Sequence, residues 1–445
     1  MEIRIEDQCP QCGAALVLQE TDHLLTCRFC GVKSVIRSRG PFRYCLPPAR
    51  GSGAGERLLH VPYLRFKGTI FLINEAGIGH KVVDTTRIGT GLAELPPSLG
   101  VRPQAMPVRR LAPRTPGRFL PLTIKASAIL EKVIRLSPLR IEKRKIIRRL
   151  IPGSGSGDEA LFSYDSRMET TEYSSHDRFL HRAFIGETIS LLYLPLEVQN
   201  DRVVDAVTGQ PLVPFEPINV LAGQAVRFRS SWQTRFEATL CPRCGWSLEG
   251  EGDARVMTCS NCNSAWSLGK EGFTEVQWRM VSGNASTRVY LPFWRITGTI
   301  PEVGIASFAD FIRRTNQPML VRPQWQDLPM RFLVPAFKLQ PKTFLRVGRQ
   351  ATISQWHLLA SNGRVQQHLH PVTLPASEAR QAIKVILAAC TASRQKIFPF
   401  LPQMHLRPGA VELLYLPFAD KGHDWYQPES GITVGKNVLR FGRRL

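Results

Sequence analysis

The stretch Cys9-Pro10-Gln11-Cys12-Gly13 opens the chain, and Cys27-Arg28-Phe29-Cys30-Gly31 follows it after a short insert. A Cys-x2-Cys pair on a tight turn directs two thiolates to one point, about 4 Å apart. Two such turns complete a tetrahedron around a metal ion with bonds of about 2.3 Å. The same Cys-x2-Cys-x14-Cys-x2-Cys spacing recurs at Cys241, Cys244, Cys259 and Cys262. The sequence therefore predicts two four-thiolate metal sites.

The residues beside the cysteines favour the same turns. Proline fixes the turn, and the glycine that follows lets backbone amides approach the sulfurs. Only the last turn ends differently, in Asn263, and asparagine tolerates the left-handed backbone nearly as well. Each quartet resembles a zinc ribbon over about 25 residues. This resemblance implies two structural zinc ions, with ligands Cys9, Cys12, Cys27, Cys30, Cys241, Cys244, Cys259 and Cys262.

Other uses of these thiols fit less well. Four thiolates can hold a single iron in rubredoxin-like proteins, which carry the same turn but usually a longer insert between the two pairs. A catalytic zinc needs an open coordination position, which a four-cysteine site does not leave. Disulfides would require an oxidising compartment. Cys45 and Cys390 remain outside the quartets, and neither lies in a nucleophile pattern.

Composition limits the class of protein. The 445 residues carry a formal charge of +22, with 43% hydrophobic and 21% charged residues, which excludes wholesale disorder. The polar N-terminus and the short apolar runs predict a soluble, cytoplasmic protein without a transmembrane segment. The excess charge indicates an anionic partner such as nucleic acid, an acidic membrane surface or an acidic protein.

Motifs outside the quartets also recur. Residues 61–70 resemble residues 291–300, Val-Arg-Pro-Gln at 101–104 recurs at 321–324, and Leu-Leu-Tyr-Leu-Pro at 191–195 recurs at 413–417. Collinear matches with a slowly drifting offset indicate a tandem duplication.

We expect an α+β, strand-rich fold with pseudo-twofold duplication, in which each ribbon precedes a mainly antiparallel β module with a few helices. Alternating apolar residues predict strands at 58–73, 187–198, 287–300 and 410–418. The best helix is 377–392, with Ser377 as its cap. The expected divisions are ribbon 1 at 1–40, module 1 at 41–225, ribbon 2 at 226–280 and module 2 at 281–445.

Positive charge is concentrated in two windows. Residues 101–151 hold 14 basic and 2 acidic residues. Residues 321–371 hold 7 basic residues and 1 acidic residue, and we expect them to lie at the equivalent place in the second half. Within the first window, the pattern over 137–151 predicts a basic amphipathic helix. An ordinary solvated surface helix would show the same pattern. The candidate anion-binding residues are Arg140, Lys143, Arg144, Lys145, Arg148 and Arg149.

Catalytic motifs are missing from the sequence. There is no Gly-Lys-Ser/Thr phosphate loop, no Gly-x-Ser-x-Gly turn and no His-Glu-x-x-His pair. We therefore expect a non-enzymatic zinc-binding interaction protein that engages an anionic partner, nucleic acid first. Two alternatives stay open: a scaffold that binds proteins or an anionic membrane surface, and a zinc-stabilised enzyme whose site is assembled from distant residues.

Overall fold

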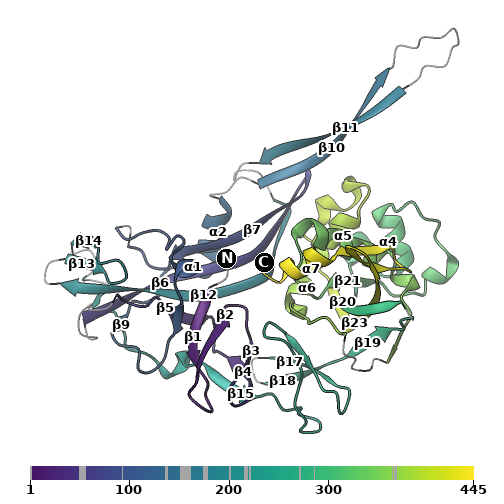
Figure 1. Ribbon diagram of the computed structural model, residues 1–445. Coiled ribbons are helices and arrows are strands. Elements are labelled where there is room, and N and C mark those ends of the chain that lie inside the picture. The colour runs from purple at the N-terminus through teal and green to yellow at the C-terminus, as the bar shows by residue number, and fades with distance from the viewer. Residues whose placement is uncertain are drawn as a thin grey trace.

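Strands dominate the fold, in several mainly antiparallel sheets (Figure 1). This confirms the strand-rich class. The computed structural model describes residues 3–49, 57–92, 94–135, 139–150, 162–173, 179–199, 202–214, 219, 222–269, 272–284, 286–362, 364 and 368–444.

The first half is built on a ten-stranded sheet whose centre is the antiparallel pair of β6 and β12. β6 is buried along its whole length: most of its side chains are aromatic or branched, and the polar His60, Arg65 and Lys67 are buried with them. The strands predicted at 58–73 and 187–198 are thereby confirmed. The strands are β1 (Arg4–Gln8), β2 (Ala15–Gln19), β5 (Phe42–Cys45), β6 (Leu58–Asn74), β7 (Gly77–Ile88), β8 (Val108–Arg110), β9 (Arg118–Phe119), β12 (His181–Gln199), β13 (Arg202–Asp205) and β14 (Pro211–Pro214), and the helices are α1 (Arg102–Ala105) and α2 (Ala126–Arg135).

The second half is built on a seven-stranded sheet around β20 and β23, which confirms the strands predicted at 287–300 and 410–418. The predicted helix at 377–392 is present, but Pro375 is its N-cap and Ser377 lies in the first turn. The strands are β19 (Trp278–Val281), β20 (Thr287–Thr299), β21 (Arg331–Pro335), β22 (Ala360–Asn362), β23 (Arg407–Lys421), β24 (Asp424–Gln427) and β25 (Ile432–Gly435), and the helices are α4 (Phe308–Thr315), α5 (Pro341–Ile353), α6 (Ala376–Cys390) and α7 (Lys436–Gly442).

Matching sequence motifs occupy matching register positions in the two halves. Pro62 of β6 lies opposite Tyr193 of β12, and Pro292 of β20 lies opposite Tyr415 of β23. All four residues belong to motifs that the sequence analysis matched between the halves. The matched motifs therefore pair with each other in the same way in each half.

The backbone beyond these strands also repeats. The Pro62 carbonyl accepts a hydrogen bond from the Gly89 N–H (2.8 Å), and the Pro292 carbonyl accepts one from the Ala336 N–H (3.0 Å). The carbonyls of Gly89 and Ala336 in turn each accept from two consecutive N–H groups, which belong to Thr123 and Ile124 in the first half and to Thr373 and Leu374 in the second. These segments lead into α2 and α6 respectively.

One sequence match does not correspond to a shared position. β7 pairs with β6 in the first half, and β21 pairs with β20 in the second, so β7 and β21 are counterparts. Val-Arg-Pro-Gln at 101–104 follows β7, whereas the same four residues at 321–324 precede β21. The expectation that the two basic windows lie at equivalent places is therefore wrong. A four-residue match is too short to establish equivalence by itself.

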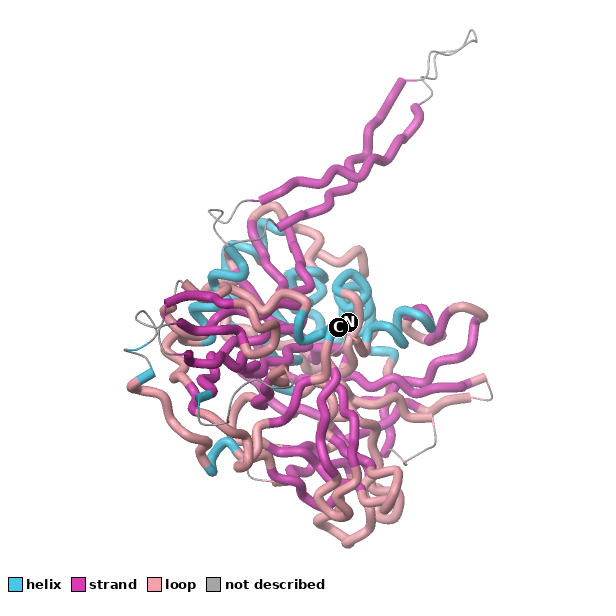
Figure 2. The backbone as a smooth tube through the Cα atoms, turned by 60° about the vertical axis from the view of Figure 1, so that its left-hand side comes forward, coloured by secondary structure: helices cyan, strands magenta, loops and turns pink. Residues whose placement is uncertain are grey.

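The predicted basic helix is also wrong. Leu139–Leu150 is a strand, β10, which pairs antiparallel with β11 (Phe162–Tyr173) and projects away from the body of the protein (Figures 1 and 2). Residues 137, 138 and 151 of the predicted helix lie outside the described residues. The sequence of β10 also suits a strand, because β-branched isoleucines recur along it. The register sets Arg140 opposite Glu172 and Lys143 opposite Glu169.

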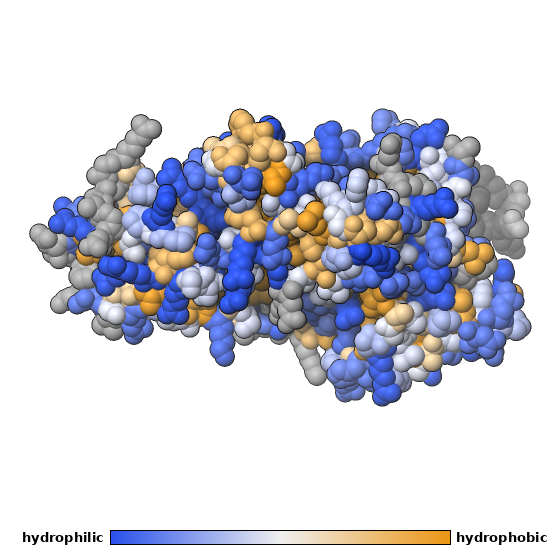
Figure 3. Space-filling view, turned by 90° about the horizontal axis from the view of Figure 1, so that it is seen from below, coloured by the Kyte–Doolittle hydropathy of each residue, from blue (hydrophilic) through white to orange (hydrophobic). Residues whose placement is uncertain are grey.

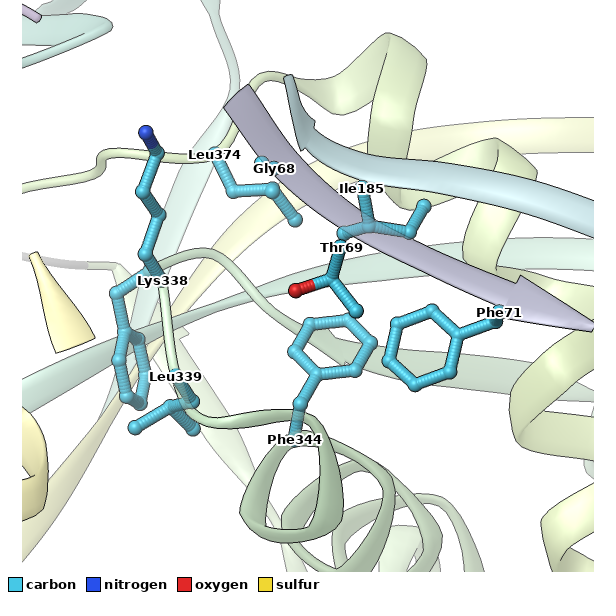
Figure 4. A pocket seen from close by; sticks show the side chains of 10 residues that line it. Gly68, Thr69, Phe71, Ile185, Lys338, Leu339, Phe344 and Leu374 are labelled. Atoms are coloured by element: carbon cyan, nitrogen blue, oxygen red, sulfur yellow. The ribbon is translucent and has the colours of Figure 1, made fainter. Parts of the chain in front are cut away.

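The two halves pack together through apolar side chains. Phe71 and Ile73 of β6, with Ala183 and Ile185 of β12, belong to the hydrophobic core of the second half. The ring centroids of Phe71 and Phe344 lie 5.9 Å apart, and Figure 4 shows the two rings side by side. The cavity that remains here is about 20 Å³, which leaves room for about one water molecule.

Candidate metal centres

The first cysteine quartet forms a compact cluster at the tips of two hairpins. Its four Sγ atoms lie within 4.8 Å of one another, with 3.7 Å between Cys9 and Cys30 and 3.7 Å between Cys12 and Cys27. A tetrahedron with metal–sulfur bonds of about 2.3 Å has edges of about 3.8 Å. The thiol spacing therefore matches a four-thiolate metal site.

The second quartet repeats this geometry. Its Sγ atoms also lie within 4.8 Å of one another, with 3.5 Å between Cys241 and Cys262 and 3.5 Å between Cys244 and Cys259. The hydroxyl of Ser264 lies 3.0 Å from the Cys262 sulfur and also accepts from the indole N–H of Trp266 (2.7 Å). A buried aromatic side chain thus fixes a polar group beside this cluster.

All four turns adopt one backbone conformation. The N–H of the residue after each second cysteine donates to the carbonyl of the first, as from Gly13 to Cys9 (2.9 Å) and from Asn263 to Cys259 (2.9 Å). Asn263 has a φ of 60°, and the three glycines at the equivalent position have φ of 72–73°, all in the left-handed region. The predicted tolerance of asparagine for this conformation is confirmed.

Backbone amides favour the thiolate form of Cys27 in the first cluster. The N–H of Phe29 donates to the Cys27 sulfur (3.4 Å). The backbone N–H of Cys30, and after it that of Phe29, lowers the pKa of Cys27 to about 6. A thiolate held by amide donors is the form that binds a metal ion, so the donor set fits a closed tetrathiolate site.

The segments around the two clusters dock against each other; residues 3–40 are called ribbon 1 below, and residues 226–269 with 272–280 are called ribbon 2. β4 (Lys33–Arg37) continues from the first cluster, and β15 (Arg235–Ala238) leads into the second, and these two strands pair antiparallel. The remaining ribbon strands are β3 (Leu24–Thr26), β16 (Val256–Thr258), β17 (Ala265–Leu268) and β18 (Phe273–Val276).

Contacts beyond the paired strands reinforce this docking. The carbonyl of Gly252 accepts from the N–H groups of His23 (2.6 Å) and Leu24 (2.9 Å). Leu24 and Val35 of ribbon 1 share a small hydrophobic core with ribbon 2, including Cys241, Cys259, Met257 and Trp266. No motif in the sequence predicts this docked unit, although the half-apolar Arg-Phe-Glu-Ala stretch at 235–238, just before Cys241, is a signal for a strand.

The six cations predicted to bind an anion all lie on β10: Arg140, Lys143, Arg144, Lys145, Arg148 and Arg149. They therefore lie on a strand of the projecting hairpin, away from both cysteine clusters (Figure 1).

Cys45 has a partner that its sequence context did not reveal. Its Sγ lies 3.4 Å from Nδ1 of His60, whose Nε2 lies 2.8 Å from the Pro116 carbonyl oxygen. Since that carbonyl can only accept, Nε2 carries the proton and Nδ1 is an acceptor. The single thiol proton of Cys45 has two acceptors within reach, this Nδ1 and the Leu46 carbonyl oxygen at 3.2 Å. Burial raises the pKa of Cys45 to about 12 and lowers that of His60 to about 4. Both groups are neutral near pH 7, so the pair lacks the thiolate that a nucleophile requires.

No protein-family model, curated protein or solved structure matches this chain. Within the described part of the chain, no helix is long and apolar enough to cross a membrane. The fold and the two clusters therefore define a strand-rich protein with two tetracysteine metal-binding sites.

Proposed function

We propose that the protein is a non-catalytic zinc protein, in which two structural zinc ions hold a pair of docked ribbons, and that it binds nucleic acid. The observation that supports a bound metal ion is the Sγ spacing of both quartets, with 3.5–3.7 Å between paired sulfurs. The ligands would be the eight cysteines of the two clusters, and each ion would supply folding free energy with no open coordination position. A reducing compartment such as the cytoplasm would keep these thiols available to the metal.

We infer that the two halves arose by tandem duplication. The paired motifs, the Pro62–Tyr193 and Pro292–Tyr415 register and the repeated carbonyl contacts of Gly89 and Ala336 support this. The β10–β11 hairpin would then be an addition to the first half, since only a short stretch separates α6 from β23 in the second.

Charge supports an anionic partner. Two zinc ions on eight thiolates would reduce the formal charge from +22 to about +18. A large positive excess attracts the phosphate backbone of nucleic acid. The basic strand β10 is one candidate surface, and a second is argued below.

Two measurements test this function. Metal analysis of the purified protein is expected to give about two zinc ions per chain, whereas coloured protein that contains iron would contradict the zinc assignment. Binding to DNA and RNA oligonucleotides is expected to weaken steeply as salt rises, because counterions are released from phosphates on binding. Salt-independent binding, or none, would contradict the nucleic-acid assignment.

A protein partner is the second candidate, favoured by apolar side chains exposed around the clusters. Phe29 lies within a cysteine turn and is 76% exposed, and Trp246 beside Cys244 is 57% exposed. Exposed aromatic side chains of this kind recur at protein interfaces. A pull-down from native cells with the F29A/W246A variant beside the wild type tests this candidate. Loss of a specific protein band in the variant would favour it, and identical bands would contradict it.

A further inference from the structure

Two adjoining hollows lie beside the segment 227–235. The first lies where ribbon 1 meets ribbon 2, and the second lies where this segment passes the 113–118 loop of module 1. The first has a volume of about 590 Å³ and the second about 930 Å³, and Gln233 lines both. Arginines are the only residues with permanent charge among the described residues that line them. We call these six the arginine trough: Arg37, Arg39 and Arg235 in the first hollow, and Arg114, Arg118 and Arg227 in the second.

The trough is assembled from segments far apart in sequence. The segment 227–235 runs along both hollows and ends in β15. The loop that ends in β9 lines the second hollow, and the end of β4 lines the first. On the face seen in Figure 3, hydrophilic side chains separate small apolar patches, so this face has no single broad apolar surface.

Like charges are held together here at a cost. Arg235 lies directly opposite Arg37 in the β4–β15 pair, and like charges in such positions destabilise a sheet. Arg37 is compensated by Glu237 at 2.5 Å. Arg39, Arg114, Arg118 and Arg235 are exposed and form no ion pair with any other described residue. An anion bound to Arg235 would offset its charge and so reduce its repulsion of Arg37.

Aromatic side chains accompany the arginines. Phe42 lines the first hollow and Phe228 lines the second, and both are half-buried. Trp232 lies on the same segment 227–235, with the guanidinium groups of Arg43 and Arg229 at 5.1 Å and 5.9 Å from its ring centroid. Unpaired bases stack on such rings while arginines follow the phosphates, whereas a duplex keeps its bases stacked internally.

We propose that the arginine trough binds a single nucleic-acid strand, with phosphates on Arg39, Arg114, Arg118 and Arg235 and a base on Phe228. This assignment rests on the proposed nucleic-acid function and adds the strand class and the place where it binds. RNA and single-stranded DNA share the recognised chemistry, and the test distinguishes them.

The test measures fluorescence anisotropy of labelled 20-nucleotide oligo(U), oligo(dT) and a 20-base-pair duplex on the full zinc-loaded chain, from 50 to 200 mM salt. The trough variant is R114Q/R118Q/R235Q. Its matched control is R314Q/R380Q/R407Q, which removes the same charge from exposed positions of the second half. A third variant, R144Q/K145Q/R148Q, removes the same charge from β10. Zinc content and thermal unfolding verify that every variant is folded.

We expect the trough variant to lose affinity for a single strand by about tenfold or more. The slope of log K against log salt should fall by about two, because each single-strand phosphate contact contributes about 0.7. The control variant should lose less than about threefold in affinity, since its charges lie far from the trough and are screened by salt. F228A should weaken single-strand binding by about tenfold and leave duplex binding unchanged, because stacking on a ring involves unpaired bases.

Each alternative result overturns a separate claim. If the wild type binds no oligonucleotide, the proposed function fails together with the trough. If the wild type binds and the β10 variant alone loses affinity, the function stands and the trough is overturned. Equal losses in trough and control variants also overturn the trough, since only net charge would then matter. Tighter binding of the duplex than of both single strands overturns the choice of strand class.

Discussion

Arg235 of β15 lies directly opposite Arg37 of β4, in the strand pair that joins the two ribbons. A side chain selected for stability alone would not be a second arginine at this position, because directly opposed like charges are unfavourable. The pair therefore connects the stability of the docked ribbons with the charge of the trough.

Replacing Arg235 by threonine is expected to stabilise the fold. Removal of the like-charge contact and the β propensity of threonine should raise the free energy of unfolding by about 0.2–1 kcal/mol. Urea denaturation measures this change. The control R243T removes an arginine of the same ribbon that is ion-paired with Glu275, and its midpoint should stay constant or fall. Equal shifts in both variants would contradict the like-charge explanation.

Loss of metal from one ribbon is expected to weaken metal binding by the other. The strand that follows Cys30 pairs with the strand that precedes Cys241, and Leu24 packs in the core around Cys259. In the C12S/C30S variant, competition with a chelator should therefore remove the metal ion of the second cluster at lower chelator concentration than in the wild type, by about tenfold. Unchanged retention of the second ion would show that the ribbons fold independently.

Thiol labelling is expected to report on both clusters. Eight cysteines would be protected by metal, and burial raises the pKa of Cys45 and of Cys390 to about 12. Iodoacetamide at pH 7.5 should therefore modify almost no cysteine in the native holoprotein, because the thiolate is the reactive form. After chelation the eight cluster cysteines should react, as counted by intact-mass measurement. Rapid modification of Cys45 in the holoprotein would contradict its buried, neutral pairing with His60.

The contact between the halves is expected to be sensitive to pH. Oε2 of Glu378 on α6 accepts from the backbone N–H groups of Gly186 (2.5 Å) and Glu187 (3.2 Å) on β12. Burial, and after it the neighbouring Glu187, raises the pKa of Glu378 to about 7 from 4.5. Between these two values the unfolded chain is ionised while the folded chain keeps its proton, so stability falls as pH rises through this window.

The variant E378Q keeps an acceptor but cannot ionise. Relative to the wild type, it should gain up to about 3 kcal/mol in the free energy of unfolding between pH 4.5 and pH 7. Denaturant titrations at several pH values measure this gain, with the exposed Glu75→Gln as control. A wild-type stability that rises over the same range, unaltered by E378Q, would contradict the burial of an uncharged carboxyl group.

The long central strands could be predicted from sequence because their cause is local. Alternating or continuous apolar residues, as in β6 and β20, specify a strand wherever the chain places it. The helix predicted at 137–151 was wrong for the opposite reason. Strand β10 forms by pairing with β11, whose residues lie more than ten positions further along the chain.

The sequence by itself determined the cysteine clusters, their turns and the central strands. Cysteine spacing, glycine or asparagine at positions with a left-handed backbone, and hydrophobic periodicity are all local properties. Only the tertiary structure decided that the ribbons dock, that the halves share a core, that Cys45 meets His60 and that six arginines surround two hollows. These relationships join residues far apart in sequence, as Phe71 and Phe344 are. They follow from packing and strand pairing, which no short segment encodes.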